Sequence, residues 1–405
     1  MKNNRKSPSV CLIFNANQPV YFNTAMALRH NSIGTTVLCL GYRSQRNKEV
    51  LTDGTVVKKI RWDGIYSSPF YSILNPLTRI RLTIAALNEK ADVYYGYTLF
   101  TLLTLLALKL CGKKVIYCIG DDDPSNFAHV TKNILHVGFI AGSVERFFRW
   151  FENSALKKCD YVITNTESLQ NSRKRYTSNI RTIYLCPNQA FNPSNTDAQL
   201  IEKYKNYDII VYSGTVTFQS SLLKILEAFE LIKQKRSTVL LLLVGGIEKS
   251  EEAKIQELLK NRGNVILTGW LPNTEMPKYI NLGKVGLAIV NPISYSYIIS
   301  LPNKVLEQMA CGLPVVVPQG FPEIEKIIRE ARCGLLVNVY DTCQIAKATL
   351  DLLENSQLRK EMSANALEYI RRQHNLELFE KDIMGVTRLV LKTKEEKIET
   401  VKIRK

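Results

Sequence analysis

The stretch that decides the fold is residues 300–341, which read SLPNKVLEQMACGLPVVVPQGFPEIEKIIREARCGLLVNVYD. Its apolar spacing predicts a helix over 303–311, a buried strand over 314–317, a second helix over 323–331 and a second strand over 334–337. Short apolar runs that alternate with helices of this length are typical of right-handed βαβ units and a parallel sheet. We therefore expect an α/β protein.

The same alternation extends outward from this stretch in both directions. Strands are predicted at 10–14, 36–40, 55–60, 92–95, 114–119, 161–164, 208–212, 238–244, 264–267 and 285–290. Helices are predicted at 22–30, 82–88, 98–110, 143–157, 221–233, 251–261 and within 342–372. The alternation breaks once, at 187–198 (PNQAFNPSNTDA), whose Pro, Asn and Ser content is typical of a linker.

Two doubly wound, Rossmann-like halves joined by one linker are thus predicted. The expected domains are 1–190, 191–375, and a segment 376–405 that forms a helix packing back on the first domain and ends in a charged tail. Ligands of such sheets bind beyond the carboxyl ends of the strands. We expect the site at the strand-end loops of both halves, which would face each other across a cleft.

Composition narrows the class of protein. Of the 405 residues, 45% are apolar and 22% are charged, which is typical of a soluble globular chain and excludes a disordered or collagen-like one. The formal net charge of +17 favours acidic partners, namely phosphorylated substrates, anionic lipid or nucleic acid. Because no zinc-finger or RNA-recognition motif is present, we do not expect nucleic-acid binding.

Cysteine usage and the N-terminus indicate the compartment. The nine cysteines are odd in number and include no CxxC pair, and the four histidines are scattered, so we expect buried free thiols and no zinc site. Residues 1–8 lack the apolar core of a signal peptide, and polar residues interrupt the uncharged runs 93–108 and 285–303. We expect no transmembrane helix and a cytoplasmic protein, free or at the inner face of the membrane.

The start of the predicted helix 303–311 carries candidate chemistry. Pro302 fits a helix start, where the backbone amides and the positive end of the helix dipole suit a phosphate, and Lys304 adds a positive charge there. Glu307 follows one turn later, where its carboxylate could accept two hydrogen bonds from a sugar diol. The alternative is an ordinary amphipathic helix on which Lys304 and Glu307 are simply solvated.

This stretch resembles the nucleotide-binding signature of the family 4 (group 1) retaining glycosyltransferases, which have the GT-B fold. The matching residues are Pro302, Lys304, Glu307, Met309, Ala310, Gly312, Pro314, Val315, Val316, Gly320, Pro322, Glu323, Ile324, Gly334, Leu335, Leu336, Val337 and Asp341. Upstream, Gly214, the run 243–245 and Gly269 before Trp270 also match, whereas the first half resembles the family more loosely.

The resemblance implies that the second domain binds a UDP- or GDP-linked sugar. Glu307 would hold the ribose hydroxyls, and Lys304 would face the diphosphate together with the amides around Ser300 and Leu301. The base would pack near Trp270 and Leu271, and the backbone at Gly214, Thr215 and Gly245 would approach the donor. Trp270 could instead be a wall or core aromatic, and the glycines plain turn residues.

The reaction that the resemblance implies is transfer of the sugar, with retention of configuration, to a glycan, a lipid-linked or a protein acceptor. The nucleotide sugar is a co-substrate, and neither a cofactor nor a metal is expected. A sugar leaving a diphosphate needs stabilisation of the leaving group and alignment of the two substrates. Lys304 is the candidate for the first of these tasks. Because residues 15–19 (NANQP) depart from GxGxxG, a Rossmann oxidoreductase is not expected.

Several positions depart from the family pattern. Ile299 stands where many members have an acid that contacts the transferred sugar, Thr215 and Gln219 lie at or near positions of basic phosphate contacts, and Gly120 replaces a histidine. These departures favour an alternative in which the protein is a catalytically silent relative that acts as a partner or scaffold.

Asp121 keeps the acidic position that follows that histidine, in a run of three aspartates at 121–123. The run could bind acceptor hydroxyls, with Asp121 or the departing phosphate taking the acceptor proton, or it could only cap the next helix. A metal on the three carboxylates is not expected.

A second region of interest is 129–158, in which aromatic and basic residues alternate. The aromatic residues are Phe139, Phe147, Phe148, Trp150 and Phe151, with the apolar Ile140 beside the first of them, and the basic residues are Arg146, Arg149, Lys157 and Lys158. Aromatics beside cations are typical of a helix that lies on anionic lipid, so a peripheral contact with an anionic membrane is one prediction. The alternative is a helix whose aromatics face the core and whose cations are solvated.

Overall fold

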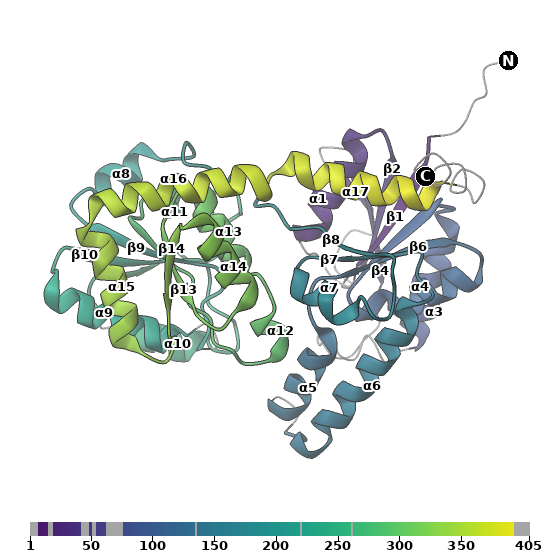
Figure 1. The fold of residues 1–405 in the computed structure, drawn as a ribbon, viewed down its shortest axis with the longest axis horizontal. Coiled ribbons are helices and arrows are strands. Elements are labelled where there is room, and N and C mark those ends of the chain that lie inside the picture. Colours follow the sequence, from purple (N-terminus) through teal and green to yellow (C-terminus); the bar gives the residue numbers. More distant parts are fainter. Residues whose placement is uncertain are drawn as a thin grey trace. The chain divides into compact units, whose positions relative to one another are not determined.

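The structure is a computed structural model that describes residues 7–14, 19–41, 48–50, 54–61, 76–133, 136–218, 221–260 and 262–392. The chain divides into two compact units, each built on its own sheet with helices on both faces (Figure 1). The first unit contains Met1–Tyr184 and Glu377–Lys405, and the second contains Leu185–Leu376. The predicted α/β class with two Rossmann-like parallel-sheet domains is therefore confirmed.

The sheet of the first unit has the order β3-β4-β2-β1-β5-β6-β7-β8. Its described strands are β1 (Ser9–Phe14), β2 (Gly34–Gly41), β3 (Lys48–Val50), β4 (Val56–Arg61), β5 (Val93–Tyr97), β6 (Lys114–Ile119), β7 (Tyr161–Thr164) and β8 (Ile180–Thr182). All pairs are parallel except the edge pair β3–β4. The central strand β1 is apolar and buried from Val10 to Phe14, as a strand covered on both faces must be.

The helices of the first unit are α1 (Pro19–His30), α3 (Pro76–Asn88), α4 (Leu99–Leu110), α5 (Asp123–Asn133), α6 (Gly138–Leu156), α7 (Glu167–Arg173) and α17 (Leu376–Leu391). The last of these joins the first unit from the far end of the chain. Thr387 of α17 lies 2.7 Å, oxygen to oxygen, from the Tyr95 hydroxyl of β5, and Arg181 of β8 pairs with Asp382 at 2.6 Å. The first unit is therefore assembled from two separate segments of the chain.

The second unit has a parallel sheet with the order β11-β10-β9-β12-β13-β14. Its strands are β9 (Asp208–Ser213), β10 (Val239–Val244), β11 (Val265–Leu267), β12 (Val285–Leu287), β13 (Val315–Pro318) and β14 (Gly334–Val337). Its helices are α8 (Ala198–Tyr204), α9 (Leu222–Lys235), α10 (Glu252–Lys260), α11 (Met276–Ile280), α12 (Tyr295–Ile298), α13 (Asn303–Ala310), α14 (Pro322–Ala331), α15 (Thr342–Glu354) and α16 (Ser356–Gln373).

The direction of winding changes between β9 and β12, because β10 and β11 extend the sheet on one side of this pair and β13 and β14 on the other. Such a switch point leaves room for a ligand at the carboxyl ends of the two strands. The chain after β12 leads into α13, so the position of the motif helix at the switch point follows from the topology.

All nine cysteines are free thiols, and only Cys111 and Cys343 among them are exposed. Of the helices in the described part of the chain, none combines the length and the apolar character needed to span a bilayer.

A buried ion network joins β6, α6 and α7 in the first unit. Asp122, which follows β6, accepts hydrogen bonds from Arg149 and Arg173, and Arg173 also pairs with Glu152 at 2.9 Å. The Tyr117 hydroxyl donates to Glu152 at 3.0 Å. Because the carboxylates and Arg173 are almost fully excluded from solvent, each charge depends on its partners for compensation.

Removing one charge from this network should destabilise the first unit strongly. Asp122→Ala leaves the buried Arg173 with one carboxylate fewer, and we expect a loss of about 3–5 kcal/mol of unfolding free energy, measured by urea denaturation. The control is Asp351→Ala, which removes an exposed partner of Lys347 and should cost less than about 1 kcal/mol. Equal losses in the two variants would contradict a structural role for the network.

Candidate functional site

The backbone ends of β9 and β10 lie unusually close together in the second unit. Gly245 follows β10 with φ of 145°, and a side-chain carbon at this position would lie 2.2 Å from the carbonyl oxygen of Gly214. Gly214 follows β9 with φ of 105°. Both positions therefore require glycine, and the structure brings these two predicted residues together at the carboxyl ends of β9 and β10.

The first turn of α13 lies over this edge. The Lys304 ammonium donates to the Tyr212 hydroxyl at 2.7 Å and lies 4.2 Å from the centre of the tyrosine ring. A side-chain carbon on Gly214 would lie 3.5 Å from Lys304 Cε, and the Tyr212 hydroxyl donates to the carbonyl of Thr215 at 3.0 Å. A single positive charge is thus positioned at the end of β9 by an aromatic ring and its hydroxyl.

A buried glutamine fixes α13 to the sheet. The Gln308 side chain is fully buried, and its Nε2 donates to Ser213 Oγ at 3.1 Å and to the carbonyl of Leu287 at 3.3 Å. Gly286 of β12 makes this approach possible, because a side-chain carbon there would lie 2.4 Å from Gln308 Oε1. The bonds to β9 and β12 set the position of the helix, and therefore of Lys304, at the switch point.

Glu307 lies one turn after Lys304 and is partly buried. Burial raises the pKa of its carboxyl to about 7, although the nearby Lys304 charge acts in the opposite direction. Within the described residues its carboxylate has no hydrogen-bond partner. The result is an acceptor group that is largely desolvated and available to a ligand, beside a positive charge.

The predicted residues Trp270 and Leu271 both lie in the loop after β11, but they have different surroundings. The Trp270 indole is 67% exposed and covers Gly246, where a side-chain carbon would lie 2.2 Å from Trp270 Nε1. An open aromatic face thus lies next to Gly245. Leu271, by contrast, packs partly buried against the core, and its side chain is not grouped with the others.

The segment before α13 contributes backbone more than side chains. Leu301 is buried in the core with Val305, and the Ser300 hydroxyl donates to the carbonyl of Tyr297 at 2.9 Å. Pro302 is the N-cap residue of α13 and makes no side-chain cap bond. The first amides of the helix are therefore left to other acceptors.

The departures from the family pattern are located as follows. Ile299 is buried, at 4% exposure, and ends α12, so its side chain belongs to the interior. Thr215 is partly buried and accepts the Tyr212 hydrogen bond through its backbone. Gln219 lies outside the described residues.

The three aspartates after β6 in the first unit have three different environments. Asp121 is exposed, but the surrounding protein and the adjacent Asp122 charge raise the pKa of its carboxyl. Burial alone would raise the pKa of Asp122, but the hydrogen bonds and positive charges of Arg149 and Arg173 stabilise its carboxylate and lower the pKa.

Asp123 accepts the Leu99 amide of α4 at 2.6 Å, and burial raises its pKa to about 8. Only Asp121 is thus open to a ligand, and the side chain of Asp123 caps α4, which the sequence did not predict.

The strand ends on either side of Asp121 hold polar groups without partners. Thr98, after β5, has φ of 67° and ψ of 163°, a backbone region that non-glycine residues rarely adopt. Its hydroxyl and the side-chain oxygen of Asn165, after β7, are buried and find no hydrogen-bond partner among the described residues. A side-chain carbon on Gly120 would lie 3.9 Å from Asn165 Nδ2. Backbone strain and unpaired polar groups at the carboxyl ends of neighbouring strands are characteristic of functional sites.

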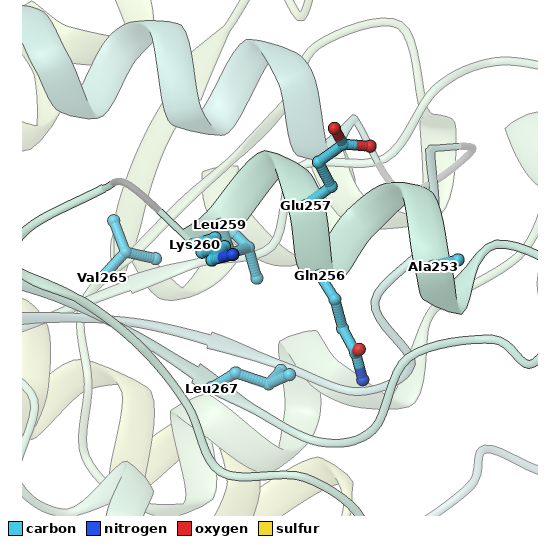
Figure 2. Close-up of a pocket in the computed structure, with 7 residues that line it drawn as sticks. All are labelled: Ala253, Gln256, Glu257, Leu259, Lys260, Val265 and Leu267. Carbon is cyan, nitrogen blue, oxygen red and sulfur yellow. The ribbon is translucent and has the colours of Figure 1, made fainter.

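A separate hollow of about 680 Å³ lies along α10 and the edge strand β11 (Figure 2). It is lined by Ala253, Gln256, Glu257, Leu259, Lys260, Val265 and Leu267. Figure 2 shows the Gln256 and Glu257 side chains extending from α10 in different directions, so the hollow lacks converging polar groups. None of the predicted site residues lines it.

In the described ranges, no group of three or more potential ligand side chains is arranged for a metal ion.

Comparison with known proteins connects this geometry to a family. Residues 194–369 match the family "Glycosyl transferases group 1". The alpha-D-kanosaminyltransferase of Streptomyces kanamyceticus is 24% identical over 251 residues, which cover 59% of this chain and 63% of the relative. The match thus spans less than two thirds of that enzyme.

Solved glycosyltransferase structures share the fold over almost the whole chain. Sucrose-phosphate synthase from Thermosynechococcus elongatus has a TM-score of 0.76 and 15% identity, covering 95% of this chain and 99% of that one. Anabaena HepE in complex with UDP has a TM-score of 0.70 and 14% identity, covering 94% and 99%. The family match thus covers most of the second unit, and the GT-B fold of these neighbours extends over both units.

The approach of Gly214 and Gly245 generates a stability prediction. Gly245→Ala places a methyl group against the Gly214 carbonyl, and we expect a fall in unfolding free energy of about 1–3 kcal/mol, measured by thermal or urea denaturation. Gly263→Ala is the control, because nothing lies within 4 Å of the added carbon there. If Gly245→Ala is as stable as the control, the two strand ends are further apart than described.

Proposed function

We propose, from the match of residues 194–369 to the group 1 glycosyl transferases, that the protein transfers a sugar from a UDP- or GDP-linked donor to an acceptor. The observation that carries the proposal is the group formed by Lys304, Glu307, Gly214 and Gly245 at the switch point of the second sheet. A cation, a desolvated carboxylate and two side-chain-free backbone positions are the parts that a nucleoside diphosphate sugar requires.

Each part has a proposed role in donor binding. The two Glu307 oxygens accept hydrogen bonds from the ribose hydroxyls, and the indole of Trp270 offers a flat surface for the base. The diphosphate lies at the start of α13, where the free amides and the dipole favour negative charge. Lys304 donates to the phosphate oxygens while keeping its bond to Tyr212, since an ammonium has three donors.

The same arrangement supports catalysis. As the bond between the anomeric carbon and the diphosphate breaks, negative charge grows on the leaving oxygen, and Lys304 stabilises it. We propose that this side chain and the helix amides, rather than a bound cation, neutralise the leaving group. We also propose retention of the anomeric configuration, in line with the family that the motif resembles.

The acceptor is proposed to bind the first unit at the edge that carries Asp121, Thr98 and Asn165. The exposed Asp121 carboxylate has a raised pKa, which makes it a better proton acceptor than an ordinary aspartate. The acceptor hydroxyl would pass its proton to Asp121 or to the departing phosphate. A glycan, a lipid-linked sugar or a protein side chain would serve as acceptor, in the cytoplasm or at the inner face of the membrane.

The role of Lys304 predicts a defect in the chemical step. Lys304→Met removes the positive charge from the leaving group, and we expect kcat to fall by about 10²–10³-fold. The control is Lys347→Met, which removes an exposed lysine of α15 that pairs with Asp351. Nucleotide release measured over a range of donor concentrations checks the prediction. A kcat within twofold of the control would show that the leaving group does not depend on Lys304.

The pKa of Glu307 predicts how donor binding depends on pH. Below about pH 7 the carboxyl is protonated and loses acceptor capacity, so the donor KM of the wild type should rise as the pH falls through 7. Glu307→Gln should raise KM about tenfold or more at pH 8 and remove this pH dependence. Glu354→Gln, an exposed substitution on α15, is the control.

The function itself is tested by a panel of UDP- and GDP-linked sugars, with nucleotide release and thermal shift as readouts. We expect one donor class to raise the melting temperature in the wild type and to do so less in Glu307→Gln. Stabilisation by neither UDP nor GDP, with no release, would favour the alternative of a silent partner or scaffold, to which Ile299 and Thr215 point.

A further inference from the structure

The outward side of α6 exposes three large aromatic side chains. Phe139 is 88% exposed, Trp150 is 65% exposed and Phe147 is 58% exposed. Side chains of this size and character are usually buried, and each left in water forgoes a substantial favourable burial. Figure 1 shows that α5 and α6 form a pair of helices that extends beyond the sheet of the first unit.

These aromatics share one side of the helix with basic residues. At 100° per residue, Phe139, Arg146, Phe147, Trp150 and Lys157 fall within an arc of about 100°. We call these five residues the α6 face. Phe147 and Trp150 lie side by side, with ring centres 6.3 Å apart. The α6 face therefore combines the adjacent Phe147 and Trp150 rings with Phe139 two turns earlier, and it carries one cation beside the pair and one at its end.

The opposite side of α6 prevents the aromatics from turning inward. Arg149 binds Asp122 at 3.0 and 2.7 Å, and Glu152 binds the buried Arg173. Phe148 packs on Phe127 of α5 with ring centres 4.6 Å apart. Rotation of the helix about its axis would break buried ion pairs, so the exposure of the α6 face is fixed by the rest of the first unit.

The charges around the α6 face are of one sign. Arg146 and Lys157 belong to it, and Lys158 follows directly and is exposed. The two acids of α6 are both engaged: Glu145 pairs with Arg149 at 2.7 Å, and Glu152 is buried. A second copy of the same face would bring like charges together, whereas an anionic surface complements the face.

We propose that the α6 face docks on the surface of an anionic lipid bilayer. Phe and Trp side chains settle at the boundary between head groups and acyl chains, while Arg and Lys reach the lipid phosphates. The contact extends the proposed function, because it would bring the protein to a lipid-linked acceptor. It is nevertheless tested without donor or acceptor, so its failure is distinct from failure of the proposed function.

Vesicle flotation provides the first test. The wild type should bind vesicles of phosphatidylcholine and phosphatidylglycerol in equal parts at low salt, and pure phosphatidylcholine much less. Phe147→Ala/Trp150→Ala should lower the partition coefficient at least about tenfold. Tyr340→Ala, which removes an aromatic that is 67% exposed in the second unit, is the matched control and should bind like the wild type.

Fluorescence identifies the residue that enters the membrane. Trp emission of the wild type should shift to shorter wavelength on adding the anionic vesicles, and Trp150→Phe should lose most of this shift while it still floats. Thermal shift by the nucleotide that stabilises the wild type, or the unfolding temperature if none does, confirms that each variant is folded.

Three results would overturn the proposal. They are absence of vesicle binding by the wild type at low salt, equal binding by the double variant, and a folded wild type that self-associates through Phe147 and Trp150 without binding vesicles. The last result would make the α6 face a contact between protein chains.

Discussion

The contact between α13 and the carboxyl ends of β9 and β12 is the constraint on which the candidate site of the second unit depends. If position 286 of β12 carried a side chain, its first carbon would clash with the Gln308 side chain of α13. Gly286 removes the obstacle under Gln308, and Gln308 then bonds to both strands. This packing delivers Lys304 to Tyr212 and leaves the start of the helix open at the switch point.

Two sites treat buried charge differently, one at the ion network of the first unit and one at Glu307 of the second. In the first, Asp122, Glu152 and the arginines compensate one another, so their burial serves to hold helices in place. In the second, Glu307 is partly buried and forms no such ion pair within the described residues. Its pKa is raised because burial disfavours the charged carboxylate. A carboxylate that the protein leaves uncompensated is one that a ligand can satisfy.

Much of this was predictable from the sequence. Alternating apolar runs and helices predicted the α/β class with two parallel-sheet domains, and the motif around Lys304 and Glu307 indicated the donor site proposed above, because local spacing and turn glycines can be read from consecutive residues. Tyr212 and Gln308 were missed, since their roles depend on contacts between residues about 90 positions apart. A polar pair Tyr212-Ser213 closing an apolar strand was the available signal. The ion pairs of Asp122 could not be predicted either, because its partners Arg149 and Arg173 come from α6 and α7.

The path of the chain has a consequence for biosynthesis. The second unit is continuous, whereas the first is completed only by α17, whose Phe379 and Ile383 fill its core and whose Thr387 meets Tyr95. The ribosome synthesises α17 only after the whole second unit. The later unit can therefore reach its native state while the earlier one still waits for its closing helix, so that folding order reverses the order of translation.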